Sequence, residues 1–248
     1  VGREHALGLA KHGAKVVVND LGAGVDGSGA DTTPAQAVVD EIKALGGEAI
    51  VNGDDVSSWT GAKNMIDQTI DAFGTIDVVV NNAGILRDRM LVNMTEDEWD
   101  AVIQVHLKGT FAPSRHAAAY WRQLSKDRGE KVDARIINTS STSGLYGNIG
   151  QTNYGAAKAG IAAFTIIAAR ELARIGVTVN AISPTAYTRM TDNLREYTEE
   201  DIERRDPRWV SPTIVYLSSA EAHDITGRVI QAGNGRVAVC EGWRRGAE

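Results

Sequence analysis

A tyrosine and a lysine lie four positions apart in the chain, with a serine upstream, and these residue types suit proton transfer. Tyr154 and Lys158 share one face of the predicted helix, because residues i and i+4 are neighbours on a helix. The ammonium can then favour the ionised phenol, whose pKa is otherwise near ~10. Ser141 follows a short apolar run at residues 135–139, and its hydroxyl can donate to a substrate oxygen. The set predicts alcohol oxidation or ketone reduction, in which a proton moves on oxygen as a hydride moves on carbon.

A tyrosine and a lysine at this spacing also occur by chance as an ordinary helix pair. Two further motifs favour the catalytic interpretation. Asn-Asn-Ala-Gly occupies residues 81–84 after an apolar run, and Asn-Ala-Ile-Ser-Pro occupies residues 180–184. With the serine thirteen positions before the tyrosine, these motifs resemble the short-chain dehydrogenase/reductase family over nearly the whole chain. The resemblance implies a Rossmann-like fold, a nicotinamide cofactor and a catalytic Ser-Tyr-Lys set.

The composition is typical of one globular domain without nucleic-acid or membrane partners. The 248 residues are 43% hydrophobic, enough for a full core, so we expect a single domain over residues 1–248. The net charge of −6 and the interspersed charges argue against a nucleic-acid surface. No apolar stretch reaches the ~20 residues that span a bilayer, and the single cysteine, Cys240, fits a reducing compartment. We expect a cytoplasmic protein with a small-molecule substrate and no metal site, and a peroxisomal location stays open for a eukaryotic source.

Short apolar runs alternate with helix-like segments, which predicts an α/β fold with a doubly wound parallel sheet. The predicted strands lie at residues 16–18, 49–51, 78–80, 135–139, 177–179 and 229–230. The predicted helices lie near residues 3–12, 34–45, 60–72, 97–124, 154–174 and 211–219. Thr95 and Glu98 have the spacing of a capping box, which predicts where the fourth helix starts.

The chain begins where this fold should already have one strand and a glycine-rich turn. In the family, the first helix begins just past the last glycine of a TGxxxGxG motif, and Gly2 resembles that glycine. The resemblance therefore implies a first strand before Val1, and a sheet without it has unpaired edges. We expect further residues before Val1 and, because the end shows no recognisable stop, a shortened C-terminus.

An acidic side chain just after the predicted strand at residues 16–18 bears on the choice of cofactor. Asp20 stands eighteen residues after Gly2, where this fold places the ribose of a dinucleotide. A carboxylate there accepts hydrogen bonds from the ribose hydroxyls of NAD and repels the 2′-phosphate of NADP. Arg3 is the counterargument, because a base near the turn can meet a phosphate, and Asp20 can also be a plain surface acid. The sequence favours NAD.

The resemblance assigns further cofactor contacts to residues that follow the later strands. Asp55 and Val56 would border the adenine, although a helix N-cap at Asp55 or Ser57 is an alternative role. A glycine after the third strand would let the backbone approach the cofactor, because it has no Cβ to collide. The remaining implied contacts are Asn82, Ala83, Gly84, Tyr154, Lys158, Pro184, Thr185 and Thr188, together with Gly2.

Two positions depart from the family pattern. The family places an asparagine in the fourth helix, where it holds a water that connects the lysine to solvent, and this chain has His106 there. Imidazole can also relay a proton, with a pKa near ~6.5, whereas a histidine on a buried helix is often only structural. Both roles stay open for His106. The family has glycine after Pro184, and this chain has Thr185, which weakens the implied contact at that point.

A glycine-rich insertion at residues 19–30 narrows the resemblance further. Together with residues 1–7, the histidine and residues 183–191, it is similar to the dehydrogenase domains of type 2 peroxisomal multifunctional enzymes. That likeness implies oxidation of (3R)-hydroxyacyl-CoA. A hydroxysteroid or other lipid alcohol is the alternative substrate. A protein of another class, a regulator that binds NAD(H) without turnover, usually loses the tyrosine or the lysine, and both are present.

The fold implies that residues 187–207 cover the substrate. Arginines in or beside this segment could bind the phosphates of CoA, but the acids interleaved with them are typical of a solvated helix, which we favour. These arginines are Arg189, Arg195, Arg204, Arg205 and Arg208.

The predicted helix after Lys158 is apolar nearly all round at residues 159–169. A helix on one face of a sheet needs only one apolar stripe, so the second one suggests burial against another subunit. We expect a homodimer or homotetramer with two-fold symmetry.

Overall fold

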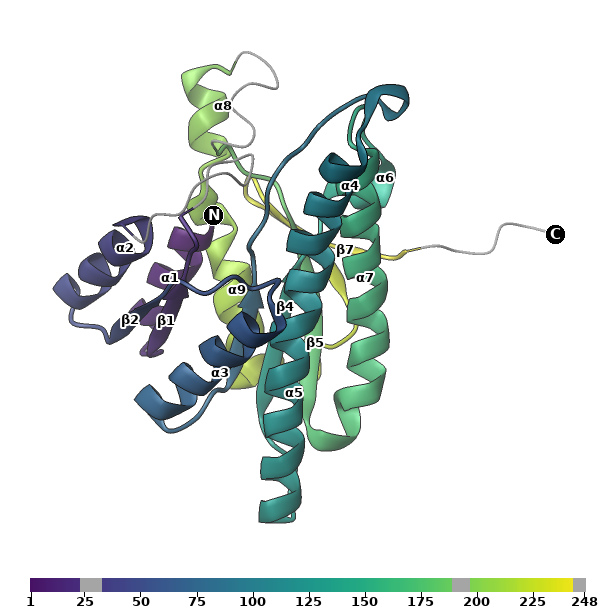
Figure 1. Cartoon of the computed structure of the whole chain (residues 1–248). Coiled ribbons are helices and arrows are strands. Elements are labelled where there is room, and N and C mark those ends of the chain that lie inside the picture. Colours follow the sequence, from purple (N-terminus) through teal and green to yellow (C-terminus); the bar gives the residue numbers. More distant parts are fainter. Residues whose placement is uncertain (23–32, 189–196, 243–248) are drawn as a thin grey trace.

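Five strands form the main sheet of the computed structural model, which describes residues 1–22, 33–188 and 197–242. Their order is β3-β4-β5-β6-β7. β1 and β2 form a separate two-stranded sheet, which lies apart from β4 and β5 in Figure 1. The bounds are β1 (Val16–Asn19), β2 (Ala49–Asn52), β3 (Val78–Asn81), β4 (Ala134–Thr139), β5 (Val177–Pro184), β6 (Val229–Gly233) and β7 (Arg236–Cys240). All neighbouring pairs are parallel except β6 with β7. The predicted parallel α/β sheet is confirmed.

The sequence analysis missed β7, the antiparallel edge strand. Asn234 and Gly235 join it to β6, and both have positive φ, 54° and 67°. Asn-Gly with two left-handed residues is the favoured two-residue hairpin turn, so this dipeptide was the available signal. The side chains of β7 are mostly exposed, and the strand therefore lacks the buried apolar pattern by which the others were identified.

The sheet is interrupted between β1 and β3. Among the described strands, β1 pairs only with β2, and β3 pairs only with β4. The described strands therefore form two sheets that are not hydrogen-bonded to each other. The two parts are held together by helices, because α1 (Gly2–Lys11) packs against both β1 and α9 (Ser211–Ser218).

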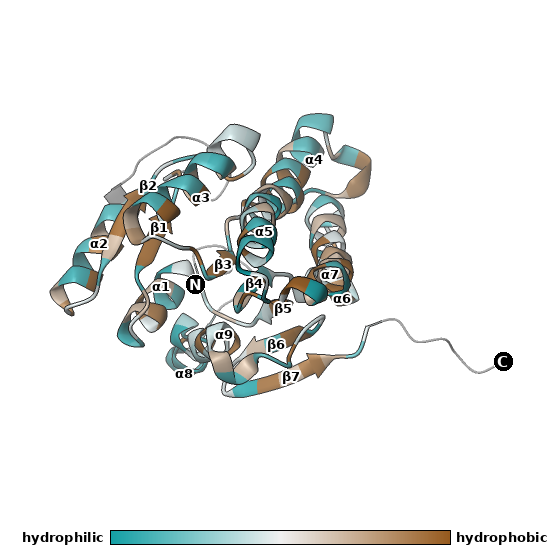
Figure 2. Ribbon diagram, turned by 90° about the horizontal axis from the view of Figure 1, so that it is seen from below, coloured by the Kyte–Doolittle hydropathy of each residue, from teal (hydrophilic) through white to brown (hydrophobic). Residues whose placement is uncertain are grey.

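Helices cover both faces of the strands, as the doubly wound fold requires (Figure 2). On one face, α1 packs between α2 (Thr33–Ala44) and α9. On the other face, α3 (Trp59–Phe73) packs against α5 (Gly109–Arg128), and α7 (Thr152–Leu172) packs against β4 and β5. The shorter elements are η1 (Leu91–Asn93), α4 (Glu96–Ile103), α6 (Thr142–Tyr146), η3 (Ala173–Ile175), α8 (Glu199–Arg204), η4 (Pro207–Trp209) and η5 (Ala220–Ala222).

The predicted helix at residues 97–124 is α4 and α5 joined by one π-helical turn, η2 (Gln104–Lys108). A π turn inserts an extra residue into the helix and is common at functional sites. It rotates the side chains that follow relative to those of α4. Sequence periodicity does not reveal such a turn, because the apolar pattern continues through it.

The central strands are buried on both faces, which explains their continuous apolar runs. On β4, Ile136 belongs to a cluster with Trp121 of α5, and the adjacent Ile137 belongs to a cluster with Ile214 of α9. The Trp121 indole is 1% exposed, and its N–H donates to the carbonyl oxygen of Ile76 at 2.6 Å. Among the described residues, no helix has the length and apolar character to cross a membrane.

The predicted capping box is confirmed at the start of α4. The Thr95 hydroxyl accepts from the Glu98 backbone N–H at 3.2 Å, and the Glu98 carboxylate accepts from the Thr95 backbone N–H at 2.9 Å. Thr95→Ala removes one partner, and we expect the free energy of unfolding to fall by about 1 kcal/mol in denaturant titrations. Thr95→Ser keeps the hydroxyl and is the matched control. An equal loss in both variants would contradict the assignment to the cap.

Candidate active site

Ser141, Tyr154 and Lys158 come together where β4 ends and α7 begins. Ser141 is the N-cap of α6, and its side chain hydrogen-bonds the Tyr154 phenol. The Lys158 ammonium lies 5.6 Å from the centroid of the Tyr154 ring. Gly144 permits this packing of α6 on α7, because a Cβ there would stand 2.6 Å from the Ala159 nitrogen. The three predicted catalytic residues therefore form one cluster.

Lys158 is 3% exposed, and its ammonium donates to the backbone carbonyl of Thr139 at 2.6 Å. Burial lowers the pKa of Lys158 to about 7, because the charged form loses its hydration. Burial also raises the pKa of Tyr154, the Ser141 hydrogen bond opposes this rise, and the Asp88 carboxylate adds to it. The prediction that Lys158 lowers the pKa of the phenol is wrong in this structure. The Lys158 ammonium donates to Thr139, and desolvation is the largest influence on the pKa of Tyr154.

His106 lies in the π turn η2 and faces Tyr154, with the two rings edge to face at 5.1 Å between centroids. Its Nε2 lies 2.8 Å from the carbonyl oxygen and 3.1 Å from the nitrogen of Ile85. Burial, followed by the Lys158 charge, lowers the pKa of His106 to about 3, so the ring is neutral at physiological pH. A Cβ on Gly84 would stand 2.3 Å from the imidazole, so this ring position requires glycine there. These contacts anchor the imidazole beside Tyr154.

Two polar residues that the sequence analysis missed fix the start of α7. The Asn153 amide donates to the carbonyl oxygens of Arg87 at 2.9 Å and Glu98 at 3.0 Å. The Gln151 amide donates to the Asp88 carboxylate at 2.7 Å. Their only sequence signal was their place within three positions of Tyr154, because no motif marks a partner far away in the chain.

The residues predicted to contact a nicotinamide cofactor lie at the carboxyl ends of the parallel strands. Gly2 begins α1 beside Asn82, and a Cβ on Gly2 would stand 2.9 Å from the Asn82 side chain. Asp20 follows β1, is exposed, and accepts from the Gly22 backbone N–H at 2.7 Å. Ala83 follows Asn82 directly and is also exposed. A glycine at the start of a helix fits the phosphates of a dinucleotide, and an exposed carboxylate at the end of a parallel strand fits its ribose.

The remaining predicted contacts follow β2 and β5. The Asp55 carboxylate accepts from the Ser57 backbone N–H and hydroxyl, both at 2.8 Å, so it closes a turn before α3. The alternative that Asp55 or Ser57 is the N-cap of α3 is wrong, because the N-cap is Ser58. Val56 is half-buried beside Asp55, and Thr185 donates its backbone N–H to the carbonyl oxygen of Ala232 at 2.8 Å. The two contacts that flank Thr185 in the prediction are half-buried as well: Pro184 and Thr188.

Three buried polar atoms at this edge of the sheet have no hydrogen-bond partner within the described parts of the chain. They are Nδ1 of His106, Oγ1 of Thr139 and Oγ of Ser183. Buried polar groups are normally satisfied, so orphaned atoms indicate a place for a polar partner. Together with Gly2 and Asp20, they fit a site for a dinucleotide.

Comparison with known proteins agrees with this geometry. The sequence model of the family described as short chain dehydrogenase matches residues 1–201. Hydroxyacyl-CoA dehydrogenase ChsB1 of Mycobacterium tuberculosis is 45% identical over 238 residues, which cover 92% of this chain and 72% of that protein. Peroxisomal multifunctional enzyme type 2 of Drosophila melanogaster is 43% identical over 237 residues, covering 95% of this chain and 37% of that protein. The crystal structure of a short chain dehydrogenase from Mycobacterium avium has 56% identity and a TM-score of 0.89, covering 100% of this chain and 83% of that one.

The buried lysine gives a stability test. The pKa of Lys158 is about 7 when folded against 10.5 for a free side chain, so the unfolded chain binds more protons between these values. The free energy of unfolding should therefore rise with pH in this window, by at most about 1.4 kcal/mol per unit from this residue. Lys158→Met should lose that slope in denaturant titrations at pH 7, 8 and 9. Lys63→Met, at an exposed site on α3, is the control and should keep it. Equal slopes in the native chain and Lys158→Met would contradict the buried-amine account.

Proposed function

This chain belongs to the short-chain dehydrogenase family, and we propose that it is an NAD-dependent enzyme that oxidises (3R)-hydroxyacyl-CoA to the 3-ketone. The observation that carries the proposal is the cluster of Ser141, Tyr154 and Lys158 with His106 against it. A nicotinamide, when bound, supplies the hydride acceptor. The chain supplies the groups that hold the substrate oxygen and exchange its proton.

Tyr154 is the proposed acid and base. Tyr154 is half-buried, and its phenol lies next to the Ser141 hydroxyl, so both can hydrogen-bond one substrate oxygen. Burial favours the protonated phenol, which can give a proton to a ketone in the reduction direction. In the oxidation direction the ionised phenol accepts the proton of the alcohol. Lys158 and His106 flank the ring and are held by the backbone of Thr139 and Ile85. We propose that both side chains keep the Tyr154 ring in position by packing against it.

NAD is favoured over NADP by the partners of two side chains. Asp20 places a carboxylate at the end of β1, where a 2′-phosphate would be repelled. Arg3, the one basic group that argued for NADP, is engaged elsewhere. Its guanidinium hydrogen-bonds both carboxylate oxygens of Glu41, at 2.6 and 2.7 Å, and pairs with Glu4. A phosphate would have to compete with two carboxylates for this arginine.

An acyl chain is favoured by the surface beside the catalytic cluster. The Arg89 backbone N–H donates to the carbonyl oxygen of Gly150 at 2.7 Å, which joins the loop before α7 to the segment that leads into α4. Exposed apolar side chains gather on these two segments: Met90, Leu91, Val92, Tyr146 and Ile149. Exposed apolar groups this dense mark binding surfaces. The surface suits a fatty acyl group, and the names of two relatives point to hydroxyacyl-CoA and to multifunctional enzyme type 2.

A hydroxysteroid is the second candidate substrate, because a fused apolar ring system also suits this exposed apolar surface. A regulator that binds NAD(H) without turnover is disfavoured, since the serine, tyrosine and lysine are all present and clustered.

We also propose that the segment at residues 187–207 covers the substrate. Arg189 and Arg195 lie outside the described residues. Arg204 pairs with Glu200 at 3.6 Å, Arg208 pairs with Glu203, and the Arg205 guanidinium lies 5.6 Å from the Tyr197 ring centroid. These internal pairs support the interpretation of α8 as a solvated helix, with no cluster of arginines turned to a CoA phosphate among the described residues.

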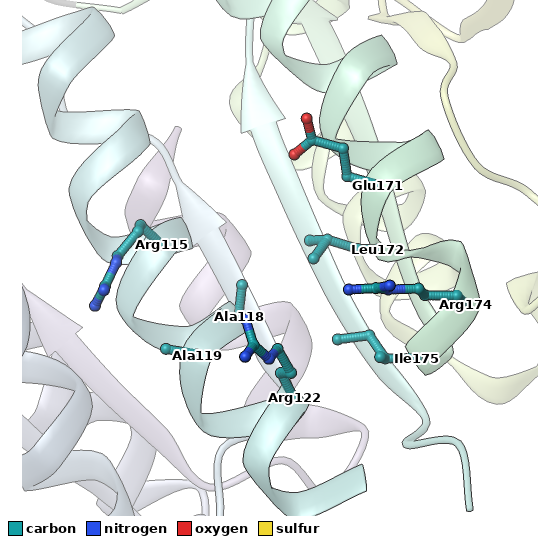
Figure 3. Close-up of a pocket in the computed structure, with 8 residues that line it drawn as sticks. All are labelled: Arg115, Ala118, Ala119, Arg122, Glu171, Leu172, Arg174 and Ile175. Carbon is teal, nitrogen blue, oxygen red and sulfur yellow. The ribbon is translucent and has the colours of Figure 1, made fainter. Parts of the chain in front are cut away.

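A homodimer through α5 and α7 is the proposed assembly. A groove of about 540 Å³ separates these helices, and it contains none of the catalytic residues. Figure 3 shows Leu172 and Ile175 pointing toward α5 across the small side chains of Ala118 and Ala119. Ile167 of α7 is 56% exposed on the same helix. Small residues beside exposed apolar ones allow two helices of a second copy to approach closely.

The assembly has a direct test by mass. Ala119→Arg places a long charged side chain in the groove, and we expect the protein to sediment as a monomer where the native chain sediments as a dimer or tetramer. Ala44→Arg, at an exposed position on α2, is the matched control and should leave the mass unchanged. A native chain that is monomeric at micromolar concentration would contradict the proposal.

The function is tested by nicotinamide reduction with NAD or NADP against (3R)-hydroxyacyl-CoA, its (3S) isomer and a 17β-hydroxysteroid. We expect turnover of the (3R) ester, at least about tenfold faster with NAD, because rejecting the phosphate costs on the order of 1.4 kcal/mol or more. Turnover of the steroid alone, or with NADP alone, would contradict the substrate or cofactor assignment. Tyr154→Phe is the matched control, which should abolish turnover and leave NAD binding in calorimetry nearly intact. An active Tyr154→Phe enzyme would remove the phenol from the mechanism.

A further inference from the structure

A chain of hydrogen bonds runs from the catalytic serine to a carboxylate that the proposed reaction does not use. The Ser143 backbone N–H donates to the Ser141 hydroxyl at 3.2 Å, and the Ser143 hydroxyl donates to the Gln151 carbonyl oxygen at 2.8 Å. The Gln151 amide nitrogen then donates to the Asp88 carboxylate at 2.7 Å. The first link lies within the turn that begins α6, and the next two join this turn to Gln151 and to Asp88 after β3.

Gln151 is the centre of this network. It is 7% exposed, and its carbonyl oxygen also accepts from the Asn148 side chain at 3.0 Å. Its backbone forms a parallel bridge with Arg89. One carboxamide thus connects Ser143 of α6, Asn148 of the loop before α7 and Asp88 of the segment after β3. A buried amide with all of these partners satisfied is a rigid support, because losing any partner leaves a buried polar group unpaired.

Asp88 also acts on Tyr154 through space. Its carboxylate is exposed, and its negative charge disfavours the ionised phenol, so it adds to the rise that burial causes in the pKa of Tyr154. The other groups that face the phenol are the Ser141 hydroxyl, the Lys158 ammonium from α7 and the neutral His106 ring from η2. Asp88 is the acid among them.

We propose that Asp88 and Gln151 are positioning residues of the active site: Gln151 holds the Ser141 loop against Tyr154, and Asp88 anchors Gln151. The inference rests on the proposed role of Tyr154 as acid and base. The inference distinguishes a geometric contribution from a charge contribution, and replacing either residue by alanine would change both at once. Gln151 acts through geometry, and Asp88 acts through geometry and charge.

Two near-isosteric variants separate these contributions. Asp88→Asn keeps an oxygen that accepts from Gln151 and removes the charge. Oxidation needs the ionised phenol, so kcat/KM rises with pH, and the rise should move to lower pH at low salt. The plateau rate should stay within about twofold, because the hydrogen bond is kept. At high ionic strength the shift should shrink, because the charge is exposed and screened.

Gln151→Met nearly keeps the volume and removes all three hydrogen bonds of the carboxamide. The plateau kcat should fall about tenfold or more with KM nearly unchanged, because Ser141 loses its support in the transition state, and the pH midpoint should stay within 0.1 unit or so. Asp127→Asn on α5 is the matched control, since this exposed carboxylate also accepts from a glutamine amide, that of Gln123 at 2.7 Å. It should change neither quantity.

A measurement without substrate keeps the inference separate from the proposed function. The ultraviolet absorbance of ionised tyrosine at pH 10, taken as the difference between each protein and its Tyr154→Phe counterpart, reports the ionised fraction of Tyr154 alone. That fraction should be larger in Asp88→Asn than in the native chain and unchanged in Asp127→Asn. An ionised fraction in Asp88→Asn equal to that of the native chain would overturn the inference. So would a native pH profile in Asp88→Asn together with a native rate in Gln151→Met, and both results hold whatever the substrate proves to be. A larger fraction without turnover of any tested alcohol would overturn the substrate proposal and leave the inference standing.

Discussion

The buried amine of Lys158 is the constraint on which the site depends. Its ammonium donates to the carbonyl of Thr139, the last residue of β4, at 2.6 Å, so it ties the first turns of α7 to the carboxyl end of the central strand. An amine in the interior must be hydrogen-bonded or neutral, since an unpaired buried charge is very costly. That requirement fixes the register of α7 on the sheet. Tyr154, one turn earlier on the same helix, is positioned as a consequence.

The parallel sheet then gathers the other groups at one edge. Asn81 of β3 and Asn138 of β4 are partners in register, and the Asn81 amide donates to the Asn138 carbonyl oxygen at 2.8 Å. The Asn138 amide continues to the Thr165 hydroxyl on α7 at 2.9 Å. Parallel strands end at the same side of a sheet, so segments distant in sequence deliver polar residues to one place. These hydrogen bonds between Asn81, Asn138 and Thr165 join β3, β4 and α7 close to the catalytic cluster.

Burial acts in opposite directions on the two ionisable catalytic groups. It raises the pKa of the Tyr154 phenol and lowers the pKa of Lys158 to about 7, because both changes remove charge from a region of low polarity. Neighbouring charges and hydrogen bonds adjust this base state: the Ser141 bond favours the ionised phenol, and the Asp88 charge opposes it. With a pKa of about 7, Lys158 is partly charged at neutral pH, while the Tyr154 phenol is protonated.

The sequence by itself determined the α/β fold, six of the seven strands in the described residues, the capping box at Thr95 and the family, because strand periodicity, caps and the Ser-Tyr-Lys spacing are local signals. The tertiary structure alone decided the rest. The π turn at His106, the Gln151–Asp88 bond and the direction of the Tyr154 pKa depend on contacts between segments far apart in the chain. Periodicity reports which face of an element is buried, but the depth of that burial and the partner of a buried polar group are set by packing, which no local pattern encodes.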